Sequence, residues 1–342
     1  MKKLDFRSDT VSLPTSEMRQ SMLNAEVGDD TMRDDPTVIA LEENCASLFG
    51  KEEAVFMASG TMANQVAVML LTSRGEEIIL GDTSHLYNLE VGGLAALSQV
   101  QAKCISATKR LYDPTDIDEA FRGKGIQFAR TSLLCLENAK DLNRGFAVPV
   151  DNLQEVADIA HQHGARVYVD GARILNAACA LNVDVKDLVS MADVCSLVFT
   201  KALGSPFGAV LMGSHELMQE ARWLKQRLGG GFRQIGFMAA PALYALEHLV
   251  ERIHIDHENA QILARGLNDL GLLDGALEDI DISIVIGNCS KLKQSALNFS
   301  EQLKKHDLLV KPISENNFRM ITHIGLEKED VFDALNRIES AM

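Results

Sequence analysis

The chain has 342 residues, of which 46% are hydrophobic and 24% are charged. This composition is typical of a folded globular protein with a large core, and it argues against long disordered segments. Its 33 basic residues are outnumbered by 48 acidic residues, which gives a formal net charge of −15. Because nucleic-acid binding needs clustered positive charge, we expect no nucleic-acid partner.

The first residues and the cysteines indicate the compartment. The opening segment MKKLDFRSDT contains no apolar signal sequence, and no apolar run approaches the roughly 18 residues of a membrane span. The six cysteines are scattered along the chain without a CxxC pair. Such spacing favours reduced thiols over disulfides or a zinc site. We therefore expect a cytoplasmic protein with no membrane partner and no bound metal.

Short apolar segments alternate with amphipathic segments from about residue 53 onward. The expected strands lie at 53–57, 76–80, 131–138, 165–170 and 195–200, and the expected helices lie at 61–71 and 150–164. This alternation predicts βαβ units and a mostly parallel sheet. Since ligands bind beyond the carboxyl ends of the strands in such sheets, the residues after each strand are candidate site residues.

The second half of the chain predicts a smaller α/β unit. Residues 235–262 have long helical periodicity, in which Pro241 predicts either a break or the start of a helix. Further helices are expected at 258–270, 295–306 and 327–342, and further strands at 281–287 and 316–324. We therefore expect one large domain at residues 1–245, including an N-terminal arm, and a small C-terminal domain at residues 246–342.

Lys201 stands at the end of an apolar segment, in VFTKALGSPFG. A lysine after a strand is usually a solvated loop residue. A lysine that forms a Schiff base needs a lowered pKa, a walled pocket and an electron-accepting cofactor. The segment ASGTMANQ offers an anion site, because a helix that starts at SGT directs backbone N–H groups and a hydroxyl at an anion. The same residues are also ordinary helix caps.

Two other polar residues follow predicted strands. Asp170 ends the apolar strand ARVYV, where a carboxylate would keep the ring nitrogen of a pyridine cofactor protonated. His85 follows EEIILGDTS, where an imidazole would stack over such a ring or act as an acid or base. A histidine at such a place is more often a hydrogen-bonded structural residue.

Successive motifs resemble, in order, those of the threonine aldolase or β-eliminating lyase family, whose members are fold-type-I enzymes that use pyridoxal 5'-phosphate (PLP). The matching segments are DFRSDTVSLPTSEMRQSM, VGDD with DDPTVIALEE, SGTMANQVA, SHLYNLEVGGLA, VDGARILNAA, TKALGSPFGAVL, RLGGGFRQIG and, near the C-terminus, FRMITH. The resemblance implies an α/β fold like that of aspartate aminotransferase. It implies a large domain with a mostly parallel seven-stranded sheet, a small C-terminal α/β domain, and a homodimer or homotetramer.

The resemblance also implies a role for each matching residue. Lys201 would form the Schiff base with the cofactor, Asp170 would partner the pyridine nitrogen, and His85 would stack on the ring. The positions that match phosphate contacts are Gly60, Thr61 and Thr200. The positions that match contacts to the substrate carboxylate are Ser8, Arg173 and Arg319, and Arg173 is also expected to contact the cofactor. Arg233 matches a motif near the cofactor or the subunit boundary.

Two segments depart from the family pattern. Where the family usually has LENTHN, this chain has LENAKDLN, so Lys140 replaces a histidine expected to contact the substrate's β-hydroxyl. Where the family usually has VGDDVYGEDPT, this chain has VGDDTMRDDPT, which puts Met32 and Arg33 in place of an aromatic residue and a glycine. Both cations, Lys140 and Arg33, are therefore expected near the pocket wall and among the substrate-binding residues.

These two cations leave alternatives open. They would bind an extra anionic group on the β or γ carbon of an amino acid substrate. Alternatively, they turn into solvent or pair with nearby carboxylates, as exposed cations usually do. The carboxylates nearby in sequence are Asp34, Asp35 and Asp141.

The resemblance implies a PLP-dependent aldehyde-lyase with a small-molecule amino acid substrate. It would cleave β-hydroxy-α-amino acids such as L-threonine or L-allo-threonine to glycine and an aldehyde by retro-aldol chemistry. A second interpretation keeps the cofactor but changes the reaction to β-elimination, racemisation or transaldol chemistry, and Lys140 is its main support. A third interpretation is a binding or regulatory protein without activity. Retention of Lys201, Asp170 and the phosphate-binding positions favours an enzyme.

Overall fold

The large domain contains a seven-stranded sheet. The structure is a computed structural model, and it describes residues 2–123, 125–140, 142 and 144–342. The strands are β2 (Glu53–Met57), β3 (Glu77–Gly81), β4 (Gln101–Ile105), β5 (Thr131–Glu137), β6 (Arg166–Asp170), β7 (Val194–Val198) and β8 (Ala209–Gly213). Their order is β2-β8-β7-β6-β5-β3-β4, and β8 pairs antiparallel with β2 and β7 while the other pairs are parallel. The expected mostly parallel seven-stranded sheet is therefore confirmed.

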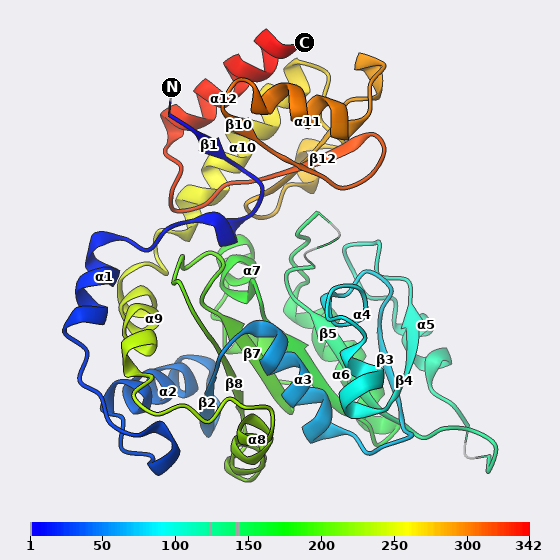
Figure 1. Ribbon diagram of the computed structural model, residues 1–342. Helices are drawn as coiled ribbons and strands as arrows, with labels where there is room; N and C mark the ends of the chain where they lie inside the picture. Colours follow the sequence, from blue (N-terminus) through cyan, green and yellow to red (C-terminus); the bar gives the residue numbers. More distant parts are fainter. Residues whose placement is uncertain (1, 124, 141, 143) are drawn as a thin grey trace.

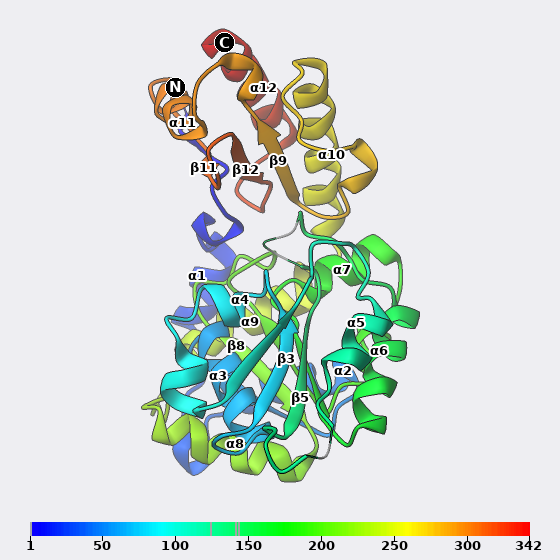
Figure 2. The ribbon, with the colours of Figure 1, turned by 90° about the vertical axis from the view of Figure 1, so that its right-hand side faces the viewer.

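Helices cover both faces of this sheet, as Figures 1 and 2 show. One face packs against α3 (Gly60–Leu71) and α8 (His215–Arg227), and the other against α2 (Pro36–Phe49), α6 (Val150–Gln162), α7 (Ile174–Leu181) and α9 (Gly236–His248). The large domain also contains three shorter helices, α1 (Ser16–Leu23), α4 (His85–Asn88) and α5 (Pro114–Ala120). Successive strand residues point to opposite faces, so Val55 and Phe56 belong to different cores.

The small domain packs three helices against a three-stranded antiparallel sheet. The helices are α10 (Ile253–Asp269), α11 (Ala296–Lys304) and α12 (Lys328–Ala341), and the sheet has the order β11 (Lys311–Pro312), β12 (Asn317–Ile321), β9 (Ile284–Asn288). The N-terminal arm joins this domain, because β1 (Leu4–Asp5) pairs in parallel with β10 (Leu308–Leu309). Leu4 and Phe6 are buried in the small-domain core. In the described part of the chain, no helix is long and apolar enough to span a membrane.

The prediction for Pro241 is wrong. Pro241 neither breaks nor starts a helix but lies inside α9, and the two long helices are separated instead at residues 249–252. A proline removes one hydrogen bond from the helix interior. The alanines on either side of it, at 239, 242 and 245, are fully buried, and this close packing outweighs the lost bond. The expected domain boundary after residue 245 falls within α9 and stays a prediction.

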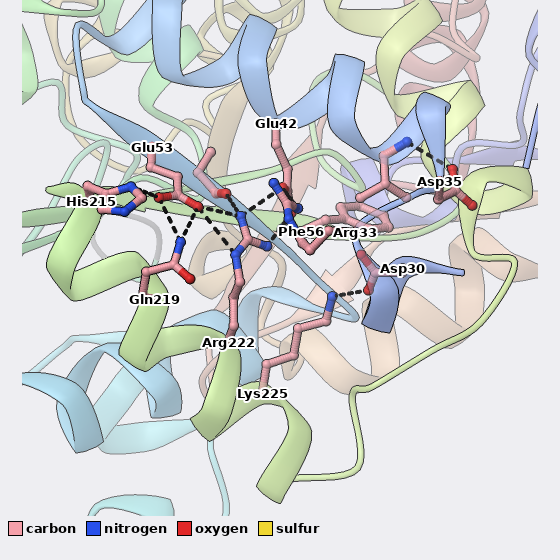
Figure 3. Close-up of polar contacts among 12 residues, drawn as sticks. Asp30, Arg33, Asp35, Glu42, Glu53, Phe56, His215, Gln219, Arg222 and Lys225 are labelled. Atoms are coloured by element: carbon pink, nitrogen blue, oxygen red, sulfur yellow. Dashed lines mark hydrogen bonds and ion pairs between the residues drawn. The ribbon is translucent and has the colours of Figure 1, made fainter. Parts of the chain in front are cut away.

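A buried ion-pair network joins α2 to β2 and α8 (Figure 3). The carboxylate of Glu42 accepts hydrogen bonds from Arg222 at 3.1 and 2.9 Å and from the backbone N–H of Phe56 at 2.8 Å. Arg222 also donates to Glu53 at 2.7 Å. The side chain of Glu42 is only 3% exposed and that of Arg222 is 15% exposed, so water replaces neither partner easily.

This network generates a stability prediction. Replacing Glu42 with Gln should lower the free energy of unfolding by about 3 kcal/mol, because one partner of a buried ion pair is lost. Urea denaturation followed by circular dichroism measures the change. Glu43→Gln is the matched control, since Glu43 is exposed on the same helix, and it should change the free energy by less than about 0.5 kcal/mol. Equal effects of the two substitutions would contradict the prediction.

Candidate active site

Polar side chains from five strands meet at the carboxyl ends of the parallel strands. They line a pocket of about 190 Å³ that contains six of the predicted residues: Gly60, Thr61, His85, Asp170, Thr200 and Lys201. The structure adds Thr10, Ser59, Asn64 and Glu137 to the lining. The sequence separations are large, and the parallel sheet brings the residues together because each one follows or ends a strand at the same edge.

One end of the pocket suits an anion. Helix α3 begins there, and the first N–H groups of a helix have no partner within the helix. The Ser59 hydroxyl caps the helix by accepting a hydrogen bond from the N–H of Met62 at 3.1 Å. Gly60 allows a close approach to β7, since a Cβ at this position would lie 2.8 Å from the side chain of Val198. A phosphate bound at this helix start would also face Thr200 across the pocket.

A buried carboxylate, Asp170, lines the same pocket. Asp170 accepts hydrogen bonds from the side-chain amide of Asn64 at 2.7 Å and from the backbone N–H of Ala172 at 3.0 Å. Burial raises the pKa of Asp170, and the nearby charge of Glu90 raises it further. A protonated ring nitrogen beside Asp170 would oppose both effects. The buried carboxylate of Asp170 therefore fits a cationic pyridine ring, from whose N–H it would accept a hydrogen bond.

His85 lies in the same pocket and is held by another carboxylate. Its Nδ1 lies 2.8 Å from Oε1 of Glu90, and its backbone N–H donates to Glu137 at 3.2 Å. The hydrogen bond to Glu90 raises the pKa of His85, as does the charge of Asp170, whereas burial and the charge of Lys201 lower it. The imidazole is thus biased toward its cationic form.

The pocket contains the groups that PLP requires. It has an anion-binding helix start, a buried carboxylate for the ring nitrogen and a lysine, Lys201, that follows β7. Among the described residues, no group of three His, Cys, Asp or Glu side chains is placed to hold a metal ion.

Arg173 connects the N-terminal arm to this region. Its Nε and Nη2 donate to the two carboxylate oxygens of Asp9 at 2.7 and 2.8 Å, and both side chains are 1% exposed. Ser8 precedes Asp9 in the chain, and its hydroxyl accepts a hydrogen bond from the N–H of Thr10 at 3.2 Å. Thr10 lines the pocket, whereas Ser8 and Arg173 are not among the lining residues. Their contact with a substrate carboxylate stays a prediction.

Arg319 lies on β12 of the small domain and is buried, outside the lining of the pocket. The small domain nevertheless approaches the loop after Lys201. A Cβ at Gly204 would lie 2.8 Å from the side chain of Ile324 and 3.4 Å from the hydroxyl of Ser12. The predicted role of Arg319 in carboxylate binding is not tested by this arrangement.

Arg33 and Arg233 do not join the pocket within one chain. Arg33 forms an ion pair with Glu42, rather than with Asp34 or Asp35, and it lines a separate pocket beside α8 (Figure 3). The expected position of Arg33 near the pocket wall is therefore wrong for the single chain. Arg33 has φ 62°, in the left-handed region that favours glycine, the residue usual for the family at this position.

Contacts between backbone segments explain where the two arginines lie. The N–H of Asp30 donates to the carbonyl of Arg233 at 3.1 Å, and the hydroxyl of Thr31 donates to the carbonyl of Phe232 at 2.9 Å. Arg233 is exposed and forms an ion pair with Asp29 at 3.1 Å. These contacts hold residues 29–33 against the segment that follows α8, and none of these residues lines the pocket that contains Lys201.

Lys140 is buried beside the pocket. Its Nζ donates to the carbonyl of Lys109 at 2.8 Å and lies 3.8 Å from the centroid of the Tyr112 ring. Burial lowers the pKa of Lys140 to about 8. Lys140 lines a small adjoining cavity that shares Glu137 and Asp170 with the main pocket. The alternative in which this lysine turns into solvent is therefore wrong, and Asp141 lies outside the described residues.

Besides Thr10 and Ser59, sequence reasoning missed three residues of the site, Asn64, Glu90 and Glu137. The sequence contained a signal for each of these three. Asn64 and Gln65 interrupt the apolar run of α3, and polar residues buried on an apolar helix usually have a specific partner. Glu90 stands in the motif EVGG, whose two glycines indicate an unusual backbone. Glu137 ends a fully buried strand, as Asp170 does.

Comparisons with known proteins identify the family and the fold of the chain. The family model described as Beta-eliminating lyase matches residues 5–288. Low-specificity L-threonine aldolase 1 from Arabidopsis thaliana is 36% identical, over 100% of this chain and 97% of that protein. The low specificity L-threonine aldolase of Escherichia coli K12 is 37% identical, over 96% of both chains.

Solved structures confirm the fold. A threonine aldolase from Leishmania major has a TM-score of 0.84 at 17% identity, over 98% of this chain and 99% of that chain. A serine palmitoyltransferase from Sphingomonas wittichii has a TM-score of 0.76 at 19% identity, over 99% of this chain and 86% of that chain. The expected fold type I is thus confirmed. The full-length relatives and the family match together establish that the chain belongs to the threonine aldolase and β-eliminating lyase family.

Proposed function

We propose that the protein is a PLP-dependent aldehyde-lyase that cleaves β-hydroxy-α-amino acids, such as L-threonine or L-allo-threonine, to glycine and an aldehyde. The observation that carries this proposal is the convergence of Lys201, Asp170 and the start of α3 on one pocket. Family membership through full-length relatives supports the same reaction class.

Each pocket residue has a role in this proposal. Lys201 binds the cofactor covalently, and Gly60, Thr61 and Thr200 hold its phosphate. Asp170 pairs with the ring nitrogen, and His85 faces the ring. When bound, the cofactor supplies an electron sink for the electrons of the broken Cα–Cβ bond.

The substrate carboxylate is assigned to Ser8, Arg173 and Arg319 in this proposal. Arginine suits the task because its planar guanidinium binds a carboxylate through two hydrogen bonds. The pair between Arg173 and Asp9 fixes the guanidinium beside the N-terminal arm, whose Thr10 lines the pocket.

We also propose assembly as a homodimer or homotetramer and a cytoplasmic location. Exposed Met32 and Trp223 stand beside the surface pocket that Arg33 lines, and such apolar side chains favour contact with another copy. In such an assembly, Arg33 and Arg233 would act at the pocket of another subunit. The six free cysteines suit a reducing compartment.

The reaction type can be tested by product analysis. The purified protein with PLP, incubated with a panel of β-hydroxy and β-substituted amino acids, should release glycine and the matching aldehyde in equal amounts. Mass spectrometry identifies the products. Borohydride reduction and peptide mapping should place the pyridoxyl label on Lys201, and Lys201→Ala should abolish both label and products. A keto acid with ammonia as the only products, or a label on another lysine, would contradict the proposal.

A second candidate substrate class is favoured by the burial of Lys140. A β-hydroxyaspartate-like amino acid carries an extra carboxylate, and a protonated Lys140 beside the pocket would offer it a charge partner. Because the pKa of Lys140 is lowered to about 8, the ammonium form predominates at pH 7 and is lost as the pH rises. Glu137 nearby opposes the binding of an anion, so this candidate is secondary.

Comparison of kcat/KM for β-hydroxyaspartate and threonine tests this candidate. The native enzyme should prefer the diacid by about 10- to 100-fold at pH 7, as expected for a hydrogen bond to a charged group. The preference should decline above pH 8, where Lys140 loses its charge. Lys140→Met removes the charge at similar length and should abolish the preference, and Lys140→His should shift the enzyme toward threonine. Equal rates for both substrates in the native enzyme would rule the candidate out.

A further inference from the structure

Glu90 is a fully buried carboxylate whose side chain contacts the site without lining the pocket. One of its oxygens accepts a hydrogen bond from Asn64 at 2.7 Å and lies 2.8 Å from Nδ1 of His85. The other oxygen accepts from Gln65 at 2.5 Å. Three polar side chains thus converge on one carboxylate, and their hydrogen bonds compensate for its burial.

The backbone around Glu90 is specialised for this position. Val91 has φ 54°, a left-handed conformation that β-branched residues rarely adopt, and Gly92 has φ 70°. A Cβ at Gly93 would lie 2.5 Å from the Gln65 side chain. The motif EVGG therefore turns the chain sharply and leaves room for Gln65 to reach Glu90. Such strain persists where the surrounding structure fixes it, often at a functional site.

Asn64 joins Glu90 to Asp170. Its amide nitrogen donates to both carboxylates at 2.7 Å, and its oxygen accepts the hydroxyl of Tyr168 at 2.6 Å, which sets the amide orientation. His85 is consequently coupled to the partner of the ring nitrogen through a continuous set of hydrogen bonds. The charged groups that face His85 are Glu90, Glu137, Asp170 and Lys201.

We propose that Glu90 is a positioning residue that fixes the orientation and the charge of the His85 imidazole beside the cofactor site. This inference rests on the proposed function, because His85 faces the cofactor in it. With Nδ1 bound to Glu90, the ring can turn little about its side-chain bonds, and its Nε2 is left to face the pocket. A cationic His85 would also neutralise the charge of Glu90, one of the two buried carboxylates. The other carboxylate, Asp170, would then be left to pair with the ring nitrogen.

The test measures His85 directly by NMR of the ¹⁵N-histidine-labelled holoenzyme, with His85→Asn to assign the signal. The native pKa of His85 should lie above the ordinary value of about 6.5. Glu90→Gln should lower it, because the carboxylate that favours the cation is removed. The same variant should lose about 10- to 100-fold in kcat with little change in KM, as for other partners that orient a functional histidine. Glu90→Asp, which keeps the charge, should retain much of the raised pKa.

Glu77→Gln is the matched control. Glu77 is also a buried carboxylate, but it lies at the opposite end of β3 and pairs with Arg122 at 2.9 Å. Its replacement should leave the His85 pKa unchanged. Either of two results would overturn the proposal. One is a native His85 pKa at or below the ordinary value, which can be measured without any variant. The other is a His85 pKa that Glu90→Gln does not change. If His85 titrates as expected while the enzyme releases no glycine, the retro-aldol assignment fails and the role of Glu90 stands.

Discussion

The site depends on two carboxylates, Asp170 and Glu90, that are buried within one hydrogen-bond network. Burial of a charge is costly unless hydrogen bonds and an opposite charge compensate it. Asn64 donates to both groups, and His85, whose pKa is raised by its hydrogen bond to Glu90, lies beside Glu90. Asp170 keeps a raised pKa, so this end of the pocket favours a ligand that brings a positive charge. A protonated pyridine ring has that property, and the start of α3 in the same pocket would offer backbone N–H groups to its phosphate.

A second buried pair links the site to the small domain. Asp9 and Arg173 are almost completely buried, and the arm that carries Asp9 contributes β1 to the small domain. Breaking such a pair would leave an uncompensated charge in the interior. The arm, the loop after β6 and the small domain are therefore held in one arrangement. Arg319 on β12 shares this framework, because the backbone N–H of Ile321 donates to the carbonyl of Phe6 at 2.8 Å.

Lys140 illustrates how burial changes the meaning of a substitution. A lysine in place of a histidine first suggests the loss of a group that titrates near neutral pH. Desolvation lowers the pKa of Lys140 to about 8, however, while the charges of Glu137 and Asp82 oppose this change. The position thus retains a group that titrates near neutral pH, with a longer side chain and a compact ammonium head.

The sequence by itself was sufficient for five of the seven strands of the main sheet and for most of the residues that line the pocket beside them. Alternating apolar and amphipathic segments predicted the parallel strands, and the motifs after them predicted Gly60, Thr61, His85, Asp170, Thr200 and Lys201, which the structure brings together. Strand β4 was missed because it is a partly exposed edge strand without an apolar run. Strand β8 was missed too: it is buried and follows a glycine-containing turn, with no helix between it and β7.

Only the tertiary structure decided which charges meet. Glu90 contacts side chains 5, 25 and 26 positions away, and Asn64 reaches Asp170 across 106 positions. Arg33 was expected near the pocket wall, as Lys140 was, but it lies beside Glu42. Its position is set by the packing of residues 29–33 against the segment after α8, which is distant in sequence. Local patterns report which face of a strand or helix is buried. The protonation and the partners of a polar group depend on desolvation and on charges within a few ångströms, and those are set by segments that are distant in sequence.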